Sequence, residues 1–235
     1  MKVSILIPVY NESSTLGKVL ERVRQAPLPD GCAKEIIVID DGSTDGTAVR
    51  LGGVIHHRIH HAGKGSAIRT GIGLATGDIV LIQDGDLEYD PNDFARILQP
   101  IVSGQASIVY GSRFLGKPVA MARANRIANR LLTAVANLLY GARITDEATA
   151  YKAFRTELLR KIPLTCRRFE FCPEVTAKVR RMGMRIHEVP VSYNARGIAE
   201  GKKIRARDGW EALWTLVKWR FAPESSFRPG PRSRE

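Results

Sequence analysis

Short apolar runs alternate with amphipathic stretches along the first half of the chain. Runs rich in Val, Ile and Leu, ended by Pro, Gly or Asp, predict buried strands. They cover residues 2–8, 35–39, 54–59, 80–83 and 106–110. The stretches between them predict helices that end near residues 24, 75 and 102, and a further helix that begins at the polar turn 40–47. This alternation predicts an α/β fold with a mostly parallel sheet and helices on both faces.

The strand over residues 80–83 leads into closely spaced carboxylates. Asp84 and Asp86 are separated by one residue, and Glu88 follows at the same spacing. Crowded carboxylates repel one another unless a cation lies between them, and Mg²⁺ commonly takes one or two carboxylates plus substrate phosphates. The pattern therefore indicates a Mg²⁺ or Mn²⁺ site formed by Asp84, Asp86 and Glu88. The alternative is a solvated loop in which Asp and Asn side chains cap the next helix.

Two other strand ends are acidic as well. Glu12 follows the first strand, and Asp40 and Asp41 follow the second. Parallel strands place their carboxyl ends at one edge of the sheet, so these side chains are expected to converge with Asp84 and Asp86. Convergence from separate strands is hard to explain as surface decoration, and it favours a ligand site at this edge.

The second half of the chain begins with a long predicted helix over residues 121–140. One face of this helix carries Ile127, Leu131, Val135 and Leu138. Another face carries Arg123, Arg126, Arg130, Thr133 and Asn137. The arginines form either a solvated face or a row that binds phosphate through paired hydrogen bonds.

A basic loop and an aromatic helix end the predicted domain. The loop covers residues 194–207 and carries Arg196 and Lys202. The helix, residues 208–221, has one stripe made of Trp210, Leu213, Trp214, Val217 and Phe221. Tryptophans with basic neighbours suit a membrane interface, whereas the same stripe could instead dock the helix on the core. Residues 223–235 are rich in Pro, Ser and Arg, which predicts a disordered tail.

Composition limits the classes of partner. The chain has 235 residues, 44% of them hydrophobic and 26% charged, which suits one globular domain with a sizeable core. The net charge of +12 favours an anionic partner, namely nucleic acid, anionic lipid or a phosphate-rich substrate. No apolar run approaches the roughly 20 residues that span a bilayer, and the first strand begins at Lys2, so we expect neither a transmembrane segment nor a signal peptide. The three cysteines lack metal-ligand spacing, which predicts free thiols in the cytoplasm.

Several motifs occur in the order found in a known enzyme family. They are Pro8-Val9-Tyr10-Asn11-Glu12, residues 39–47 (IDDGSTDGT), Gly63-Lys64-Gly65, residues 83–88 (QDGDLE) and Gly111-Ser112-Arg113. The chain resembles the inverting family 2 glycosyltransferases over about residues 1–220. Within them it looks most like the dolichol-phosphate, or polyprenyl-phosphate, mannose synthases, because residues 145–155, 169–171 and 189–204 are similar too.

The resemblance implies a GT-A fold with a Rossmann-like sheet. A nucleotide-sugar half, residues 1–113, would precede an acceptor half, residues 114–206, and an amphipathic helix, residues 207–222. Donor-binding residues implied by the motifs are Pro8, Tyr10, Glu12, Ile39, Asp41, Lys64, Asp84, Gly85, Asp86, Arg113, Arg196 and Lys202. The implied metal ligands for Mg²⁺ or Mn²⁺ are Asp84, Asp86 and Glu88, and the arginines at positions 123, 126 and 130 would bind the acceptor.

The chain departs from the family pattern at three positions. Gly85 replaces the commoner alanine, a change expected to be harmless. Ala150 stands where glycine or cysteine is frequent, and Cys172 stands where an acidic residue is common. The last two departures lie in the acceptor half, so the acceptor is the less defined substrate.

The acceptor decides whether the reaction needs a base. A hydroxyl acceptor requires a general base, and Asp146 is the candidate for that role. Asp84 and Asp86 are the other expected catalytic residues. A lipid monophosphate has a second pKa of about 6 and needs only cations to place it.

Three functions are compared. The leading one is transfer of mannose or glucose from a GDP or UDP sugar to a polyprenyl phosphate, by a peripheral protein at the cytoplasmic face of a membrane. The alternative is a family 2 transferase acting on a hydroxyl of a soluble or cell-envelope saccharide. A basic nucleic-acid-binding module is the third, and the acidic strand ends disfavour it.

Overall fold

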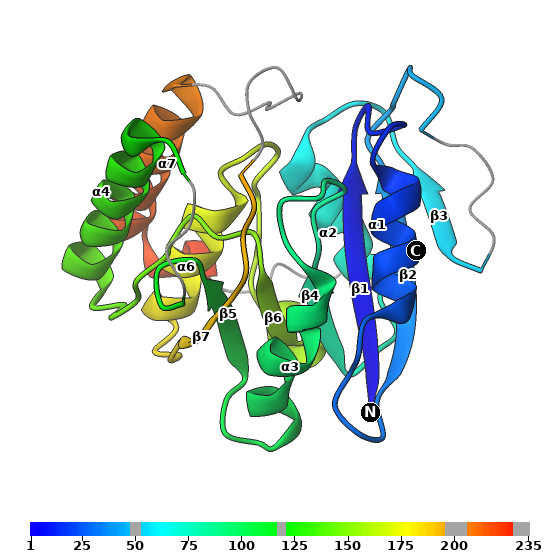
Figure 1. The fold of residues 1–235 in the computed structure, drawn as a ribbon. Coiled ribbons are helices and arrows are strands. Elements are labelled where there is room, and N and C mark those ends of the chain that lie inside the picture. Colours follow the sequence, from blue (N-terminus) through cyan, green and yellow to red (C-terminus); the bar gives the residue numbers. More distant parts are fainter. Residues whose placement is uncertain (48–52, 117–120, 196–205, 228–235) are drawn as a thin grey trace.

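The computed structural model describes residues 1–47, 53–116, 121–195 and 206–227. A single mixed sheet of seven strands forms the centre of the molecule, in the order β3-β2-β1-β4-β6-β5-β7 (Figure 1). The strands are β1 Lys2–Val9, β2 Ala33–Asp40, β3 Ile55–Arg58, β4 Ile79–Ile82, β5 Ile108–Ser112, β6 Lys152–Arg155 and β7 His187–Pro190. All pairs are parallel except those of β6, which runs opposite to β4 and β5. This confirms the α/β class and the mostly parallel sheet.

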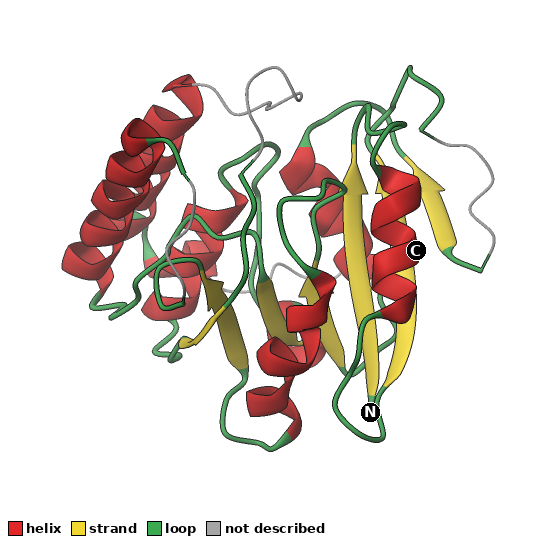
Figure 2. Cartoon of the chain, in the orientation of Figure 1, coloured by secondary structure: helices red, strands yellow, loops and turns green. Residues whose placement is uncertain are grey.

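The central strand β1 is buried on both faces, as its apolar sequence predicts. Its side chains alternate between two cores. Val3, Ile5 and Ile7 pack with helices α1 Leu16–Gln25 and α3 Phe94–Val102. Leu6 packs on the other face with α2 Lys64–Leu74 and α6 Phe171–Arg181. Helices therefore cover both faces of the sheet (Figure 2).

Two further helices form a layer beyond α6. These are α4 Arg123–Tyr140 and α7 Ala206–Phe221, which pack side by side (Figure 1). The Tyr140 hydroxyl of α4 donates to the Leu216 carbonyl of α7. The remaining helical turns are η1 Pro91–Asp93, α5 Thr156–Leu159 and η3 Glu224–Phe227.

Helix α7 docks by a different stripe from the one expected. Ala212, Leu216 and Trp219 are its buried apolar side chains. Trp210 and Trp214 are 74% and 65% exposed, and Phe221 is exposed as well. The idea that the tryptophan stripe docks the helix on the core is therefore wrong.

Helix α4 also turns its apolar face outwards. Ile127, Leu131 and Leu138 are 68%, 58% and 84% exposed, while Thr133 and Ala136 are its buried residues. The two neighbouring helices thus leave aromatic and aliphatic side chains at the surface. Exposed apolar groups gathered on neighbouring elements mark interaction surfaces more often than isolated ones do.

One local expectation, that of a fully disordered C-terminal tail, needs correction. Residues Glu224–Phe227, expected to be disordered, form a short 3₁₀ helix in which Phe227 packs edge-on against Trp219. The helix expected after the turn 40–47 falls on residues 48–52, outside the described residues.

Candidate active site

The carboxyl ends of β1, β2 and β4 lie side by side, because β1 pairs in parallel with both neighbours. Their polar ends are linked by hydrogen bonds. The Thr15 hydroxyl oxygen lies 2.7 Å from Glu12 Oε2 and 3.0 Å from the Gly85 carbonyl oxygen. The Glu12 backbone N–H also donates a hydrogen bond to the Thr47 hydroxyl oxygen. The three acidic strand ends therefore converge at one edge, as the sequence predicts.

Asp41 organises the loop that starts α2. Its carboxylate accepts from the Ala62 and Gly63 amides, each at 2.8 Å, and lies 2.9 Å from His61 Nδ1. The His61 ring in turn stacks on Tyr10, with 4.2 Å between ring centroids. Pro8 and Ile39 are paired neighbours in the β1–β2 register just below this stack. The structure thus brings the predicted nucleotide-binding residues of β1 and β2 together.

Lys64 and Asp84 form an ion pair at the same edge. Lys64 Nζ lies 2.5 Å from Asp84 Oδ1, and both side chains are partly exposed. Burial has the largest single effect and would lower the pKa of Lys64, but the neighbouring anionic groups, Asp84 first among them and Asp86 included, together raise that pKa. The ammonium therefore stays charged, directly beside the first carboxylate of the predicted metal site.

Glu88 does not complete a three-carboxylate metal site. Among the residues that the structure describes, no group of three or more His, Cys, Asp or Glu side chains could hold a metal ion. The Glu88 carboxylate accepts from the Tyr193 hydroxyl at 2.9 Å, while its backbone N–H donates to Asp86 Oδ1 at 3.0 Å. Glu88 is thereby held in a contact with Tyr193, and its prediction as a third ligand is not supported.

Asp84 and Asp86 remain as a two-carboxylate pair, and this pair fits Mg²⁺ or Mn²⁺. Both ions are hard, prefer oxygen ligands and often complete their coordination with substrate phosphates and water. The acidic oxygen set lies beside a lysine, so charges of both signs are available for a metal–diphosphate group. We therefore assign Asp84 and Asp86 as the residues that would hold such a metal.

Arg113 and Asp146 form a buried, two-pronged ion pair. Arg113 Nε and Nη2 donate to Asp146 Oδ2 and Oδ1 at 2.7 and 2.8 Å, and the Arg113 amide adds a third bond at 3.0 Å. Burial would lower the pKa of Arg113, but Tyr89 and Asp146 raise it well above its usual value. Because both Asp146 oxygens accept hydrogen bonds, the carboxylate is poorly placed to act as a general base. The role expected for Asp146 in catalysis is thus not supported by its geometry.

A second buried polar cluster lies behind this pair, and it was not predicted from the sequence. The Lys152 ammonium donates to the Glu147 and Thr149 carbonyls, and it lies 3.8 Å from the Tyr110 ring centroid. Burial raises the pKa of Glu147 to about 7, against the opposing effect of Lys152. The signal was visible in the sequence, because acidic and basic residues stand inside the 145–155 segment that leads into a strand.

The three acceptor-half arginines lie on α4. Its N-terminal end points to the same edge of the sheet as the ends of β1 and β4 (Figure 1). Arg123 and Arg130 are exposed, and the Arg130 guanidinium lies 6.0 Å from the centroid of the Phe114 ring. Arg196 and Lys202, predicted to bind phosphates, lie outside the described residues.

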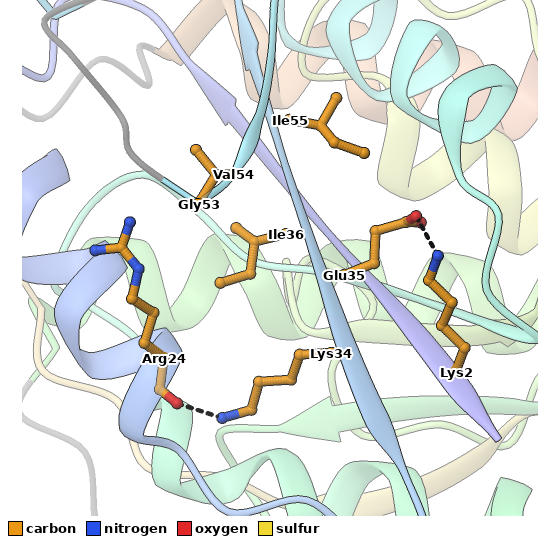
Figure 3. Close-up of a pocket in the computed structure, with 8 residues that line it drawn as sticks. All are labelled: Lys2, Arg24, Lys34, Glu35, Ile36, Gly53, Val54 and Ile55. Atoms are coloured by element: carbon orange, nitrogen blue, oxygen red, sulfur yellow. Dashed lines mark hydrogen bonds and ion pairs between the residues drawn. The ribbon is translucent and has the colours of Figure 1, made fainter.

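A surface pocket at the opposite edge of the sheet is unrelated to these residues (Figure 3). It has a volume of about 470 Å³ and is lined by Lys2, Arg24, Lys34, Glu35, Ile36, Gly53, Val54 and Ile55. Lys2 pairs with Glu35 at 2.6 Å, and the Lys34 ammonium donates to carbonyls at the end of α1. These lysines therefore already have partners, and the pocket is not a candidate site.

Comparison with known proteins decides the family. The model of the family described as glycosyl transferase family 2 matches residues 4–163, more than half of the chain. The chain belongs to glycosyl transferase family 2. The undecaprenyl-phosphate mannosyltransferase of Micrococcus luteus is 30% identical over 94% of this chain and 95% of its own length. The polyprenol monophosphomannose synthase of Mycolicibacterium smegmatis is 30% identical over 92% of this chain and 85% of its own length.

Another family 2 relative is longer than this chain. Glycosyltransferase AglJ of Haloferax volcanii is 32% identical over 83% of this chain, and the match spans only 63% of that protein. These sequence relatives confirm that the protein is a glycosyltransferase of the group to which the motifs pointed.

Solved structures confirm the GT-A fold. Glucosyl-3-phosphoglycerate synthase from Mycobacterium tuberculosis in complex with UDP superposes with a TM-score of 0.74, covering 95% of this chain and 82% of that one at 23% identity. The same enzyme with Mn²⁺, UDP and phosphoglyceric acid gives a TM-score of 0.70 at 22% identity. At this identity the likeness concerns the fold alone.

Proposed function

We propose that this protein transfers a hexose, mannose or glucose, from a GDP or UDP sugar to a polyprenyl phosphate, with inversion at the sugar. The observation that carries the proposal is the Lys64–Asp84 ion pair, two residues before Asp86, at the edge where β1, β2 and β4 end. Membership of family 2 and the names of the 30% identical relatives support this choice of reaction.

The donor half is proposed to comprise residues 1–113. Tyr10 and the Asp41-bound loop would hold the nucleoside, because they form one stacked and hydrogen-bonded unit beside the acidic edge. Asp84 and Asp86 would hold Mg²⁺ or Mn²⁺, which when bound would neutralise the charge of the leaving diphosphate. Lys64 would add a second positive charge to that diphosphate. We further propose that Gly85 lets the loop lie close against Val9.

The acceptor half is proposed to be residues 114–206. A lipid phosphate oxygen would attack C1 of the sugar as the bond from C1 to the diphosphate breaks, releasing GDP or UDP. This nucleophile carries its own negative charge at neutral pH, so no residue has to remove a proton. That requirement suits a site whose candidate base, Asp146, already accepts three bonds from Arg113. Arg123, Arg126 and Arg130 would place the acceptor phosphate.

Peripheral membrane contact, with localisation at the cytoplasmic face, is part of the proposal. Among the described residues, no helix is sufficiently long and apolar to cross a bilayer. Trp210, Trp214 and Phe221 are exposed on α7, where Lys218 is exposed as well. Tryptophan rings and basic side chains on one helix suit the headgroup region of an anionic membrane. An acceptor whose tail stays in the lipid would be presented at such a surface.

A soluble acceptor is the second candidate. The observation that favours it is the structural likeness to glucosyl-3-phosphoglycerate synthase, which was solved with phosphoglyceric acid. That acceptor presents a hydroxyl, so this function would require a general base that the Asp146 geometry does not supply.

The donor assignment is tested by calorimetric binding of a panel of GDP and UDP sugars, with and without Mn²⁺. We expect Mn²⁺-dependent binding that is lost in Asp86→Ala, whose fold is checked by circular dichroism. Binding that is independent of Mn²⁺ and unchanged in Asp86→Ala would contradict the assignment. Repeating the titration with a polyprenyl phosphate in detergent then separates the two acceptors.

A further inference from the structure

The Lys64–Asp84 ion pair poses a question about the order of binding at the donor site. Its Nζ–Oδ1 distance of 2.5 Å is that of a direct charge-assisted hydrogen bond. A metal ion on Asp84 and the Lys64 ammonium would therefore seek the same carboxylate. Two cations on one carboxylate repel each other, so the Lys64 ammonium weakens metal binding to Asp84, and a bound metal weakens the lysine contact.

We propose that Lys64 is a built-in competitor for the metal: it neutralises Asp84 before the metal binds, and it moves to the donor diphosphate once the metal arrives. This inference rests on the proposed donor site and adds a regulatory property to it. It weakens metal binding without nucleotide and strengthens it with nucleotide, because the diphosphate offers Lys64 a replacement partner.

The local structure permits the required movement. Lys64 is the first residue of α2, and its side chain is 24% exposed, so its ammonium can leave Asp84 without unpacking the core. The backbone below it is fixed. The Gly63 amide is held by Asp41, and the Gly65 amide donates to the Arg168 carbonyl at 2.9 Å. A rigid helix start with a long, flexible side chain confines the rearrangement to the Lys64 methylene groups.

Under this proposal, the binding of the metal and the binding of the diphosphate are thermodynamically coupled through Lys64. When the metal binds alone, the Lys64–Asp84 pair is lost without compensation. When the metal and the diphosphate bind together, Lys64 exchanges one anion for another. Each ligand therefore strengthens the binding of the other, and part of this coupling free energy belongs to Lys64. Removing the ammonium should tighten metal binding alone and weaken the coupling.

The test measures Mn²⁺ binding by electron paramagnetic resonance in wild type, Lys64→Met and the matched control Lys161→Met, whose lysine is exposed after α5. Without nucleotide, we expect Lys64→Met to bind Mn²⁺ at least about fivefold more tightly than wild type, the size expected for losing a partly buried ion pair. Lys161→Met should match wild type. With GDP or UDP present, the gain in Mn²⁺ affinity caused by the nucleotide should be several-fold smaller in Lys64→Met. Lys64→Gln, which keeps a polar side chain, serves if the methionine variant does not fold.

Two outcomes would overturn the inference. Equal or weaker Mn²⁺ binding by a folded Lys64→Met protein means that the lysine does not compete. An unchanged coupling between Mn²⁺ and nucleotide means that it does not move to the diphosphate. Either result leaves the proposed function standing if wild type still binds Mn²⁺ with nucleotide. Failure of every variant to bind Mn²⁺ under any condition would instead reject the metal site itself.

Discussion

Arg113 and Asp146 lie 33 residues apart in sequence, yet they share three hydrogen bonds in the interior of the site. The pair joins the end of β5 to the segment that leads into β6. Because β6 runs antiparallel between β4 and β5, residues before its start reach the same edge of the sheet as the end of β4. The pair therefore connects the end of β5 to the segment before β6 at that edge.

Breaking this pair is expected to be costly. In Asp146→Ala, the Arg113 guanidinium, whose side chain is 7% exposed, would be left buried without its counter-ion. We expect the free energy of unfolding to fall by about 3–5 kcal/mol. Urea denaturation of wild type, Asp146→Ala and Asp146→Asn measures this. If Asp146→Ala lost less than about 1 kcal/mol of unfolding free energy and regained activity at high pH, Asp146 would be a general base after all.

The buried Glu147 predicts a pH dependence of stability. Its pKa rises from 4.5 to about 7 on folding, so the folded protein holds a proton that the unfolded chain has already released. Stability should therefore fall as pH rises from about 4.5 to about 7, and level off above that. Relative to Glu147→Gln, wild type should lose at most about 1.4 kcal/mol per pH unit in this window. If the difference in free energy of unfolding between wild type and Glu147→Gln stayed constant from pH 4.5 to 7, this prediction would be contradicted.

The exposed tryptophans of α7 predict lipid binding. The double variant Trp210→Ser/Trp214→Ser should keep its stability, because both rings are largely exposed. It should bind phosphatidylglycerol vesicles at least about tenfold more weakly than wild type, since the interfacial aromatic rings are lost. Co-sedimentation with vesicles measures the binding, and Ile55→Ser on β3, where the apolar side chain is 44% exposed, is the control elsewhere on the surface. Vesicle binding that survives in the double variant would assign the membrane contact to another surface.

Gly85 is expected to tolerate a methyl group poorly, although alanine is the commoner residue at this position of the motif. A Cβ at Gly85 would lie 2.7 Å from Cγ1 of Val9. Val9 is only 3% exposed, and its β-branched side chain has few alternative rotamers. We expect Gly85→Ala to lower the free energy of unfolding by about 1–3 kcal/mol, measured by urea denaturation. A fully stable variant would show that the Val9 side chain adjusts.

The sequence predicted strands β1, β2 and β4 well, because they are continuous apolar runs whose polar ends must meet at one edge of a parallel sheet. The spacing of apolar residues along the sequence does not reveal the order of strands in a sheet. The antiparallel position of β6 between β4 and β5 was therefore not predicted. The ion pairs of Lys64 with Asp84 and of Arg113 with Asp146 join residues 20 and 33 positions apart, and only the folded chain brings them together.

Amphipathic patterns were less reliable in helices α4 and α7. A stripe such as Trp210–Trp214 predicts that one face of a helix is apolar, but not whether that face meets the core or the surroundings. The outward position of Ile127 and Leu131 on the neighbouring helix follows the same logic.

The most direct test of the proposed function is sugar transfer itself. Purified protein is incubated with radiolabelled GDP-mannose or UDP-glucose, Mn²⁺ and a polyprenyl phosphate in detergent, and the organic extract is counted. We predict a lipid-linked sugar that forms with one of the two donors and is absent with EDTA or with Asp86→Ala. No lipid product from wild type, together with transfer of the label to a soluble hydroxyl acceptor such as 3-phosphoglycerate, would contradict the account.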